Sequence, residues 1–201
     1  TKTHPFSLIQ ECYDAGITAI GENKIQEASQ KFESFENMQD ITRRFIGHLQ
    51  SNKVKKCLKM FDTIDSVDSL KLAKRISGAA LSLKKTVPVL LEINTSGEVQ
   101  KHGFLPNQLD EIIECFNETN IKIEGLMTVG PKTTEEKKTR DSFIQLRKTR
   151  DSISELLNQP NLRELSMGMS GDYEIAAEEG SSVVRLGTAL FGNRRTPDTP
   201  K

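Results

Sequence analysis

Residues 61–94 read FDTIDSVDSLKLAKRISGAALSLKKTVPVLLEIN, and the alternation within this stretch decides the fold. The run VPVLLEIN (87–94) is β-branched, continuous and apolar, which is typical of a strand buried on both faces. The run at 61–67 is also strand-like, and 68–85 between them has helical spacing. A strand–helix–strand unit of this kind predicts two parallel strands joined by a right-handed crossover.

The same period continues on both sides of that unit. Further strands are predicted at 17–21, 43–47, 121–129, 162–168 and 181–187. Helices are predicted at 5–16, 23–35, 51–60, 106–119, 133–157 and 171–180. Repeated strand–helix units predict an α/β protein, and eight units in ~200–250 residues favour a (β/α)₈ TIM barrel. An open doubly wound sheet is the alternative, although no GxGxxG follows an early strand.

One domain over residues 1–194 is expected, with a disordered tail at 195–201. Residues 1–3, TKT, read as the stub of a further strand in front of the first predicted helix. We therefore expect the first strand of the barrel to be truncated in this chain and the natural N-terminus to lie earlier.

Composition limits the classes of partner. Lys+Arg and Asp+Glu balance at 28 each, which argues against a nucleic-acid partner. No apolar run approaches the ~20 residues of a membrane span. The three cysteines are widely spaced and form no CxxC, so reduced thiols in a cytoplasmic protein are expected. The three histidines show no metal-ligand spacing, and no metal site is predicted.

Polar and small residues gather where the last two predicted strands end. In a (β/α)₈ barrel the loops after strands seven and eight commonly bind phosphate at the carboxyl edge. Gly187 lets backbone N–H groups approach an anion, Thr188 and Ser170 add hydroxyls, and the helix from Asp172 can aim its positive end there. Ordinary turn and helix-capping chemistry is the alternative reading of these residues.

Two cations complete the predicted site. Arg185 precedes Gly187 by two residues and should face the same side of its strand, towards the barrel interior. An inward arginine requires a carboxylate partner or a ligand atom that accepts a hydrogen bond. Lys2 at the mouth of the barrel could form an imine with an aldehyde, although alone it reads as a surface charge.

Five motifs together resemble the pyridoxal-phosphate homeostasis proteins. They are TKTHP (1–5), GENKIQEA (21–28), FIGHLQSNK (45–53), SMGMSGDYEIAAEEGSS (166–182) and VRLGTALFG (184–192). The resemblance runs from residue 2 to about residue 194. It implies a single-domain barrel, similar to the N-terminal domain of alanine racemase, that binds pyridoxal 5′-phosphate (PLP).

The resemblance also implies roles for individual residues. The positions that match cofactor-binding residues of such proteins are Lys2, Asn23, Ser170, Arg185, Gly187 and Thr188. Lys2 is expected to carry PLP as a Schiff base, and Arg185 to face the pyridine nitrogen. His48 is a candidate neighbour of the cofactor. One departure is clear, because Arg43 and Arg44 stand where such proteins commonly have Trp-His.

The expected function is intracellular PLP (vitamin B6) homeostasis without strong catalysis. An arginine opposite the ring nitrogen keeps that nitrogen unprotonated, which makes the ring a weaker electron sink. Racemisation needs a second acid–base group, and neither Tyr13 nor Tyr173 is predicted at a strand end. The implied partners are PLP and PLP-dependent apo-enzymes as recipients, and a monomer is expected. A PLP-dependent amino-acid racemase and a phosphorylated-metabolite enzyme are the alternatives.

Overall fold

The computed structural model of the chain describes residues 1, 4–32, 38, 40–158 and 162–192. Its described part contains a single curved sheet of parallel strands, in which each strand pairs with the next along the chain. The strands are β1 (Ala19–Glu22), β2 (Thr42–Phe45), β3 (Thr63–Val67), β4 (Val87–Glu92), β5 (Ile121–Met127), β6 (Glu164–Met169) and β7 (Val183–Arg185). This sequential order excludes the doubly wound alternative, whose strand order reverses in the middle of the sheet. The predicted near-closed α/β barrel is confirmed.

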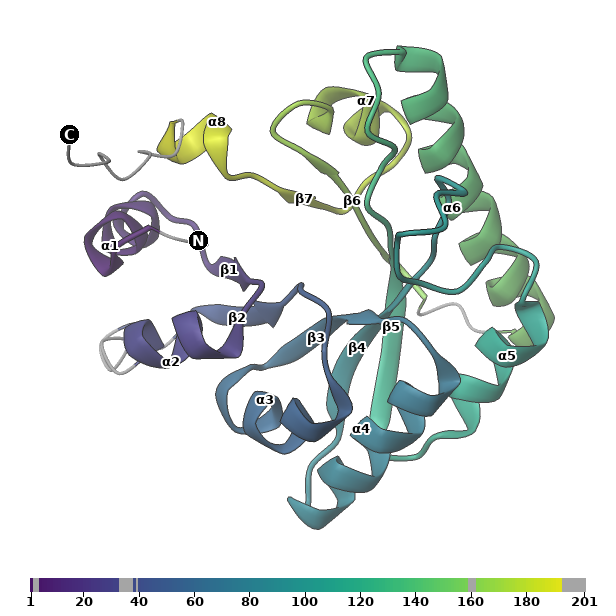
Figure 1. The fold of residues 1–201 in the computed structure, drawn as a ribbon, viewed down its shortest axis with the longest axis horizontal. Helices are drawn as coiled ribbons and strands as arrows, with labels where there is room; N and C mark the ends of the chain where they lie inside the picture. The colour runs from purple at the N-terminus through teal and green to yellow at the C-terminus, as the bar shows by residue number, and fades with distance from the viewer. Residues whose placement is uncertain (2–3, 33–37, 39, 159–161, 193–201) are drawn as a thin grey trace.

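Helices lie outside the sheet and cover its outer face (Figure 1). The α-helices are α1 (Phe6–Asp14), α2 (Ile25–Phe32), α3 (Val54–Met60), α4 (Leu70–Ser82), α5 (Leu109–Glu114), α6 (Glu136–Leu157), α7 (Tyr173–Glu178) and α8 (Thr188–Phe191). Short 3₁₀ turns, η1 (Ser51–Lys53) and η2 (Cys115–Asn117), precede α3 and follow α5. The main hydrophobic core fills the layer between the outer face of the sheet and these helices.

The barrel is open between β7 and β1. The described residues contain no pairing of these two strands. Helices α1 and α8, from opposite ends of the chain, lie on this open side (Figure 1). The ring of His4 stacks on that of Phe191 in α8, with the ring centroids 4.6 Å apart. His4, near the N-terminus, and α8, the last described helix, therefore meet at the gap between β7 and β1.

Charged side chains line the inner face of the strands, although small barrels usually contain branched apolar ones. Arg44 of β2 lies between two carboxylates, with its Nη2 2.6 Å from Glu164 Oε2 and its Nε 3.3 Å from Asp65 Oδ2. Thr63 donates a hydrogen bond of 2.7 Å to the other oxygen of Asp65. The pair with Asp65 joins the neighbouring strands β2 and β3, and the pair with Glu164 crosses the barrel from β2 to β6 and holds these two walls together.

Candidate functional site

The residues of the predicted phosphate cup come together at the carboxyl ends of β6 and β7. The hydroxyl oxygen of Ser170 accepts hydrogen bonds from the backbone N–H groups of Gly187 (3.0 Å) and Ala189 (3.1 Å). Two N–H groups thus converge on one oxygen, as they would on an oxygen of an anion. A Cβ added at Gly171 or Gly187 would meet no atom within 4 Å, so open space lies beside both residues. This arrangement fits a phosphate group.

Thr188 lies next to the cup and is exposed. Within the described part of the chain its hydroxyl makes no hydrogen bond, so it remains available to a ligand. The helix from Asp172 contributes less than expected, because α7 is short and the Asp172 side chain does not cap it. Instead, Asp172 Oδ1 accepts the N–H of Met169 at 2.6 Å and fixes the turn that carries Ser170.

Arg185 lies in the barrel interior below the cup, as its strand position predicted. Its Nη1 donates to the carbonyl oxygen (2.8 Å) and hydroxyl (2.7 Å) of Ser166, and its Nη2 donates to the carbonyl oxygen of Thr128 (2.7 Å). All three acceptors are neutral. Among the described residues no carboxylate forms an ion pair with Arg185, and its Nε–H has no hydrogen bond. Burial lowers the pKa of Arg185, yet a guanidinium keeps its proton at neutral pH.

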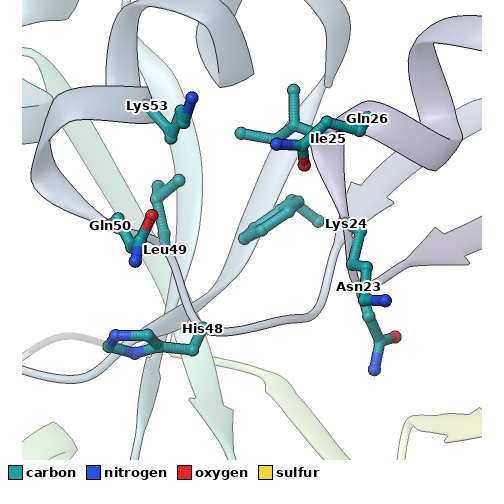
Figure 2. A pocket seen from close by; sticks show the side chains of 9 residues that line it. Asn23, Lys24, Ile25, Gln26, His48, Leu49, Gln50 and Lys53 are labelled. Atoms are coloured by element: carbon teal, nitrogen blue, oxygen red, sulfur yellow. The ribbon is translucent and has the colours of Figure 1, made fainter.

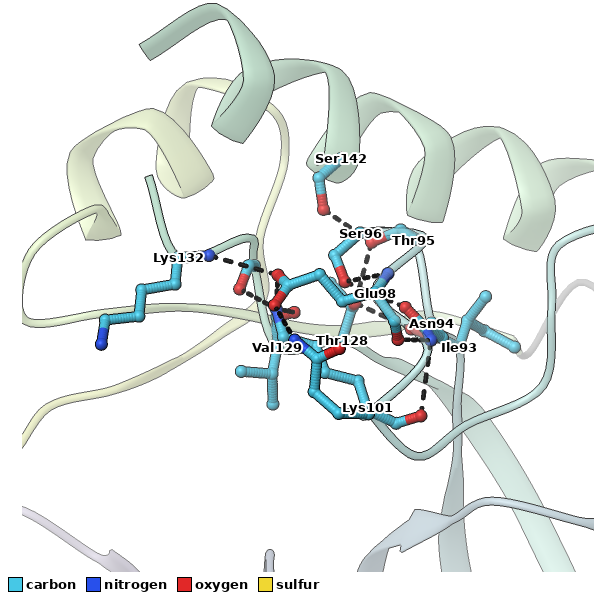
Figure 3. Close-up of polar contacts among 12 residues, drawn as sticks. Ile93, Asn94, Thr95, Ser96, Glu98, Lys101, Thr128, Val129, Lys132 and Ser142 are labelled. Atoms are coloured by element: carbon cyan, nitrogen blue, oxygen red, sulfur yellow. Dashed lines mark hydrogen bonds and ion pairs between the residues drawn. The ribbon is translucent and has the colours of Figure 1, made fainter. Parts of the chain in front are cut away.

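A chain of hydroxyl groups supports the acceptor of Arg185. Thr128 Oγ1 donates to the carbonyl oxygen of Ile93 at 2.8 Å, which uses its only hydrogen. Thr95 must then donate to Thr128 (2.8 Å), and Ser142 of α6 to Thr95 (2.6 Å). Figure 3 shows these side chains converging between the ends of β4 and β5 and helix α6. The Thr128 carbonyl that Arg185 contacts is therefore held by a network that reaches the outer helix layer.

Asn23 lies at the same edge of the sheet but on the opposite side of the mouth. With His48 and Lys53 it lines a cavity of about 190 Å³ between the loops that follow β1 and β2 (Figure 2). The two loops touch because Gly47 has no side chain. A Cβ there would lie 2.1 Å from the carbonyl oxygen of Asn23. No hydrogen bond joins Asn23 to the cup residues within the described chain.

Lys2 and Thr3 lie outside the described residues, but Thr1 and His4 are placed. The amino nitrogen of Thr1 donates to the carbonyl oxygen of Gly21 in β1 at 2.6 Å. His4 contacts Phe191 of α8, the helix that begins at the cup. Thr1 and His4 are therefore held on the two sides of the gap in the barrel, by β1 and by α8.

Arg43 and Arg44, which depart from the resembling proteins, both have clear structural roles. Arg43 binds Asp62 through two parallel hydrogen bonds, Nε to Oδ2 at 2.9 Å and Nη2 to Oδ1 at 2.7 Å. This fork raises the pKa of Arg43 and lowers the pKa of Asp62 against the opposing effect of burial. Arg44 forms the interior ion pairs described above. Neither arginine contacts the cup.

Sequence reasoning missed the partners of Arg185. Ser166 supplies both a hydroxyl and a carbonyl, and its position on β6 gave a usable signal. The registers Ser166↔Val183 and Met169↔Arg185 place it on the strand next to Arg185. The carbonyl of Thr128 gave no such signal, because every residue has one. Met127 of β5 and Met167 of β6 are buried and fill the core.

Comparisons with known proteins agree with this geometry. The family model described as "Alanine racemase, N-terminal domain" matches residues 2–195. The chain is 40% identical over 196 residues to a pyridoxal phosphate homeostasis protein of Aquifex aeolicus, covering 97% of this chain and 85% of the relative. It is 35% identical to the protein of the same name from Schizosaccharomyces pombe, covering 98% and 83%.

Solved structures give the same result. PipY of Synechococcus elongatus with PLP bound is 36% identical, with a TM-score of 0.87 over 95% of this chain and 89% of PipY. Alanine racemase of Clostridium difficile shares the fold, with a TM-score of 0.78 at 20% identity, and this chain covers 50% of it. No helix in the described part is long and apolar enough to cross a membrane. From the match along almost its whole length, the chain belongs to the pyridoxal phosphate homeostasis protein family, which is built on the alanine racemase N-terminal domain.

Proposed function

We propose that this chain binds PLP at the carboxyl edge of the barrel and acts in intracellular PLP homeostasis. The cup formed by Ser170, Gly187 and Thr188 would hold the phosphate, and Arg185 would face the pyridine nitrogen. The structure of PipY with PLP bound and the names of the curated relatives support the choice of cofactor. Asn23 is proposed to line the far side of the cofactor site.

The observation that carries this proposal is the partly buried Arg185, whose hydrogen-bond partners are all neutral. Its Nη1 and Nη2 donate to Ser166 and Thr128, which leaves Nε–H as a donor for a ligand. A pyridine nitrogen is a neutral acceptor of one hydrogen bond and matches that donor. Bound PLP supplies an electrophilic aldehyde and an electron-withdrawing ring. Since the guanidinium does not yield its proton, Arg185 would keep the ring nitrogen unprotonated and the ring a weak electron sink.

The proposed covalent attachment is through the amine of Lys2. Thr1 and His4, which are anchored to β1 and α8, support a position of the TKT motif next to the cup. A lysine amine becomes nucleophilic when desolvation lowers its pKa, as the mouth of a barrel can achieve. Lys2 would therefore hold the aldehyde of the cofactor while the cup holds its phosphate.

We propose a carrier rather than an enzyme. Racemisation requires acid–base groups on both faces of the substrate carbon. Tyr13 lies on α1 against a small core cluster, and Tyr173 at the start of α7 donates its hydroxyl to Glu174 at 3.3 Å. Neither tyrosine is at a strand end. The relatives, too, are named for homeostasis and not for a reaction.

The proposed setting follows from the same features. We propose that the protein works in the cytoplasm, where its three free cysteines would remain reduced. Its recipients would be PLP-dependent apo-enzymes, and it would work as a monomer. Size-exclusion chromatography with light scattering tests the oligomeric state. Transfer of PLP to a purified apo-enzyme, followed by recovery of that enzyme's activity, tests delivery.

The direct test is chemical trapping of the cofactor on the protein. PLP is added, the visible spectrum is recorded, the complex is reduced with borohydride, and the modified peptide is identified by mass spectrometry. We expect a yellow species trapped on Lys2. The variant Lys2→Ala should abolish it, whereas Lys148→Ala, at an exposed position of α6, should not. Label scattered over surface lysines would refute the proposal.

Two further measurements separate the alternatives. A racemase would exchange the α-proton of added amino acids for deuterium, with turnover lost in Lys2→Ala. We expect exchange no faster than with free PLP. A phosphorylated-metabolite enzyme would bind phosphate esters equally well in Lys2→Ala and give no chromophore with PLP. Ser170→Ala should weaken PLP binding, with Ser152→Ala on the exposed face of α6 as the matched control.

A further inference from the structure

Three side chains with metal-binding atoms meet at the mouth of the barrel, away from the phosphate cup. They are His48, which follows β2, Asp68, which follows β3, and His102, in the loop after β4. His48 Nδ1 lies 3.1 Å and His102 Nδ1 3.8 Å from the same oxygen, Asp68 Oδ2. All three ligand atoms lie within 4.8 Å of one another. The sequence gave no sign of this cluster because its members come from three separate loops.

The neighbouring Ser69 orients the carboxylate of Asp68. Ser69 Oγ donates to Asp68 Oδ1 at 3.0 Å, and the same Oγ caps α4 by accepting the N–H of Leu72 at 3.3 Å. One oxygen of Asp68 is thus occupied, while the other faces the two imidazoles. Metal ligands are commonly fixed in this way by a hydrogen bond from a neighbouring group. Asp68 is only 13% exposed, so its position is well determined by the fold.

The loop that carries His102 is also held in place. Its end returns to β4, where Phe104 N donates to the Glu92 carbonyl and Asn94 N donates to the Phe104 carbonyl, both at 2.8 Å. Gly103 between them has φ +112° and is packed against the backbone of Asn94, so only glycine fits there. Asn94 Nδ2 closes the loop from inside by donating to the Glu98 carbonyl at 2.9 Å. The backbone therefore fixes His102 opposite His48.

We propose that His48, Asp68 and His102 bind a divalent transition-metal ion of the zinc class. Two imidazoles and one carboxylate are a donor set that Zn²⁺ accepts, with a fourth position left for water or another ligand. Ligands at about 2.1 Å from a tetrahedral ion lie about 3.4 Å apart, so the cluster needs to contract only slightly. The proposal concerns β2 to β4 alone and stands whether or not the chain binds PLP.

Binding of a metal ion requires one change in the geometry of the histidine side chains. The rings of His48 and His102 are stacked, with centroids 3.9 Å apart and an angle of 11° between their planes. Lone pairs in two nearly parallel planes cannot point at one ion, so at least one ring must turn about its Cβ–Cγ bond. The side chains are 46% and 54% exposed, which leaves room for that rotation. Metal binding should therefore separate the stacked rings.

The test is Zn²⁺ titration of the chelator-treated, PLP-free protein by isothermal calorimetry, followed by the visible spectrum with Co²⁺. We expect one site, and a Co²⁺ spectrum of four- or five-coordinate type. Asp68→Asn and His102→Gln should each weaken Zn²⁺ binding at least tenfold. His4→Gln is the matched control, because His4 is the one other histidine of the chain, and it should bind as the parent does. Thermal unfolding of the metal-free variants verifies that they are folded.

Two outcomes would overturn the proposal. One is an absence of Zn²⁺ binding stronger than that of free imidazole. The other is binding that survives in both Asp68→Asn and His102→Gln, which would assign the ion to another group such as the thiol of Cys12. Histidine side-chain NMR gives an independent reading. Diamagnetic Zn²⁺ should shift the ring signals of His48 and His102 together and leave those of His4 in place.

Discussion

The carboxyl group of Glu92 should make the stability of this protein fall as pH rises through the neutral range. Glu92 ends β4 on its inner face, away from the helices. Burial and the nearby Asp68 raise the pKa of Glu92 from 4.5 to about 7, against the opposing effect of Arg185. The folded protein therefore retains this proton to a higher pH than the unfolded chain does. The stability that it contributes is complete below pH 4.5 and is lost as pH rises to about 7.

The size of the effect follows from linkage. A shift of a carboxyl pKa from 4.5 to about 7 changes the free energy of unfolding by about 3 kcal/mol in total. Most of this, about 2–3 kcal/mol, is lost between about pH 5 and pH 8. The variant Glu92→Gln has nothing to titrate at this position. Its stability relative to the parent should therefore increase by about 2–3 kcal/mol over the same range.

The assay is urea unfolding of the PLP-free parent and Glu92→Gln at several pH values, with EDTA present throughout. Burial also raises the pKa of Asp65 and of Glu164, but both proteins contain these groups, so their effects cancel in the comparison. Glu155→Gln, at an exposed site on α6, is the control, and its free energy of unfolding should change with pH as that of the parent does. If the free energy of unfolding of Glu92→Gln changes with pH in the same way as that of the parent, Glu92 does not have the raised pKa on which this prediction depends.

Four other substitutions test separate parts of the structure. Gly187→Ala should weaken PLP binding about tenfold in a fluorescence titration and leave urea stability nearly unchanged, because its methyl enters open space in the cup. Arg44→Met should lower the free energy of unfolding by about 3–5 kcal/mol at pH 7, because it leaves two carboxylates without their cation. The loss should be smaller at pH 5, and an equal loss at both pH values would contradict this reasoning. Gly125→Ala should cost about 3 kcal/mol or more, because its Cβ would lie 1.9 Å from the Glu164 carbonyl oxygen. Gly78→Ala, on the open face of α4, should instead raise the free energy of unfolding by about 0.5–1 kcal/mol.

The fold was predictable because the outward residues of each strand carry a strong signal. The strand predicted at 87–94 was found at Val87–Glu92, and its alternate residues Val89 and Leu91 pack in the core against the helices. Helix α8 was not predicted. It has four residues, which is barely one turn and too short for any periodicity to show.

The barrel interior was less predictable than the outer core. Arg44 is flanked in sequence by Arg43, and two adjacent arginines in a short strand give no indication that one of them points inward. What stabilises Arg44 there is a pair of carboxylates that lie 21 and 120 residues further along the chain, on β3 and β6. Such pairing depends on which strands face each other across the barrel, and a local pattern contains no information about it.

The candidate site, too, could be predicted only in part. The hydroxyl and glycine residues of the cup could be found because they follow two consecutive strands, where the fold places anion sites. The environment of Arg185 could not, since its acceptors are main-chain carbonyls and one hydroxyl from β6 and the end of β5. These acceptors orient the guanidinium without neutralising it. A carboxylate in their place would satisfy the arginine as an ion pair and reduce its attraction for an electron-rich ligand atom.

This distinction separates the two arginines of the interior. Arg44 is neutralised by carboxylates and links the walls of the barrel, so it has no charge to offer a ligand. Arg185 is partly buried and hydrogen-bonded to neutral groups, and among the described residues no carboxylate forms a direct ion pair with it, although the charges of Asp65, Glu92 and Asp172 act on it from further away. On the proposed function, the ring nitrogen of PLP would accept the N–H of Arg185 that has no partner in the described structure. The arginine at the end of β7, which no carboxylate pairs with directly, would then contribute to the affinity of the site for its cofactor.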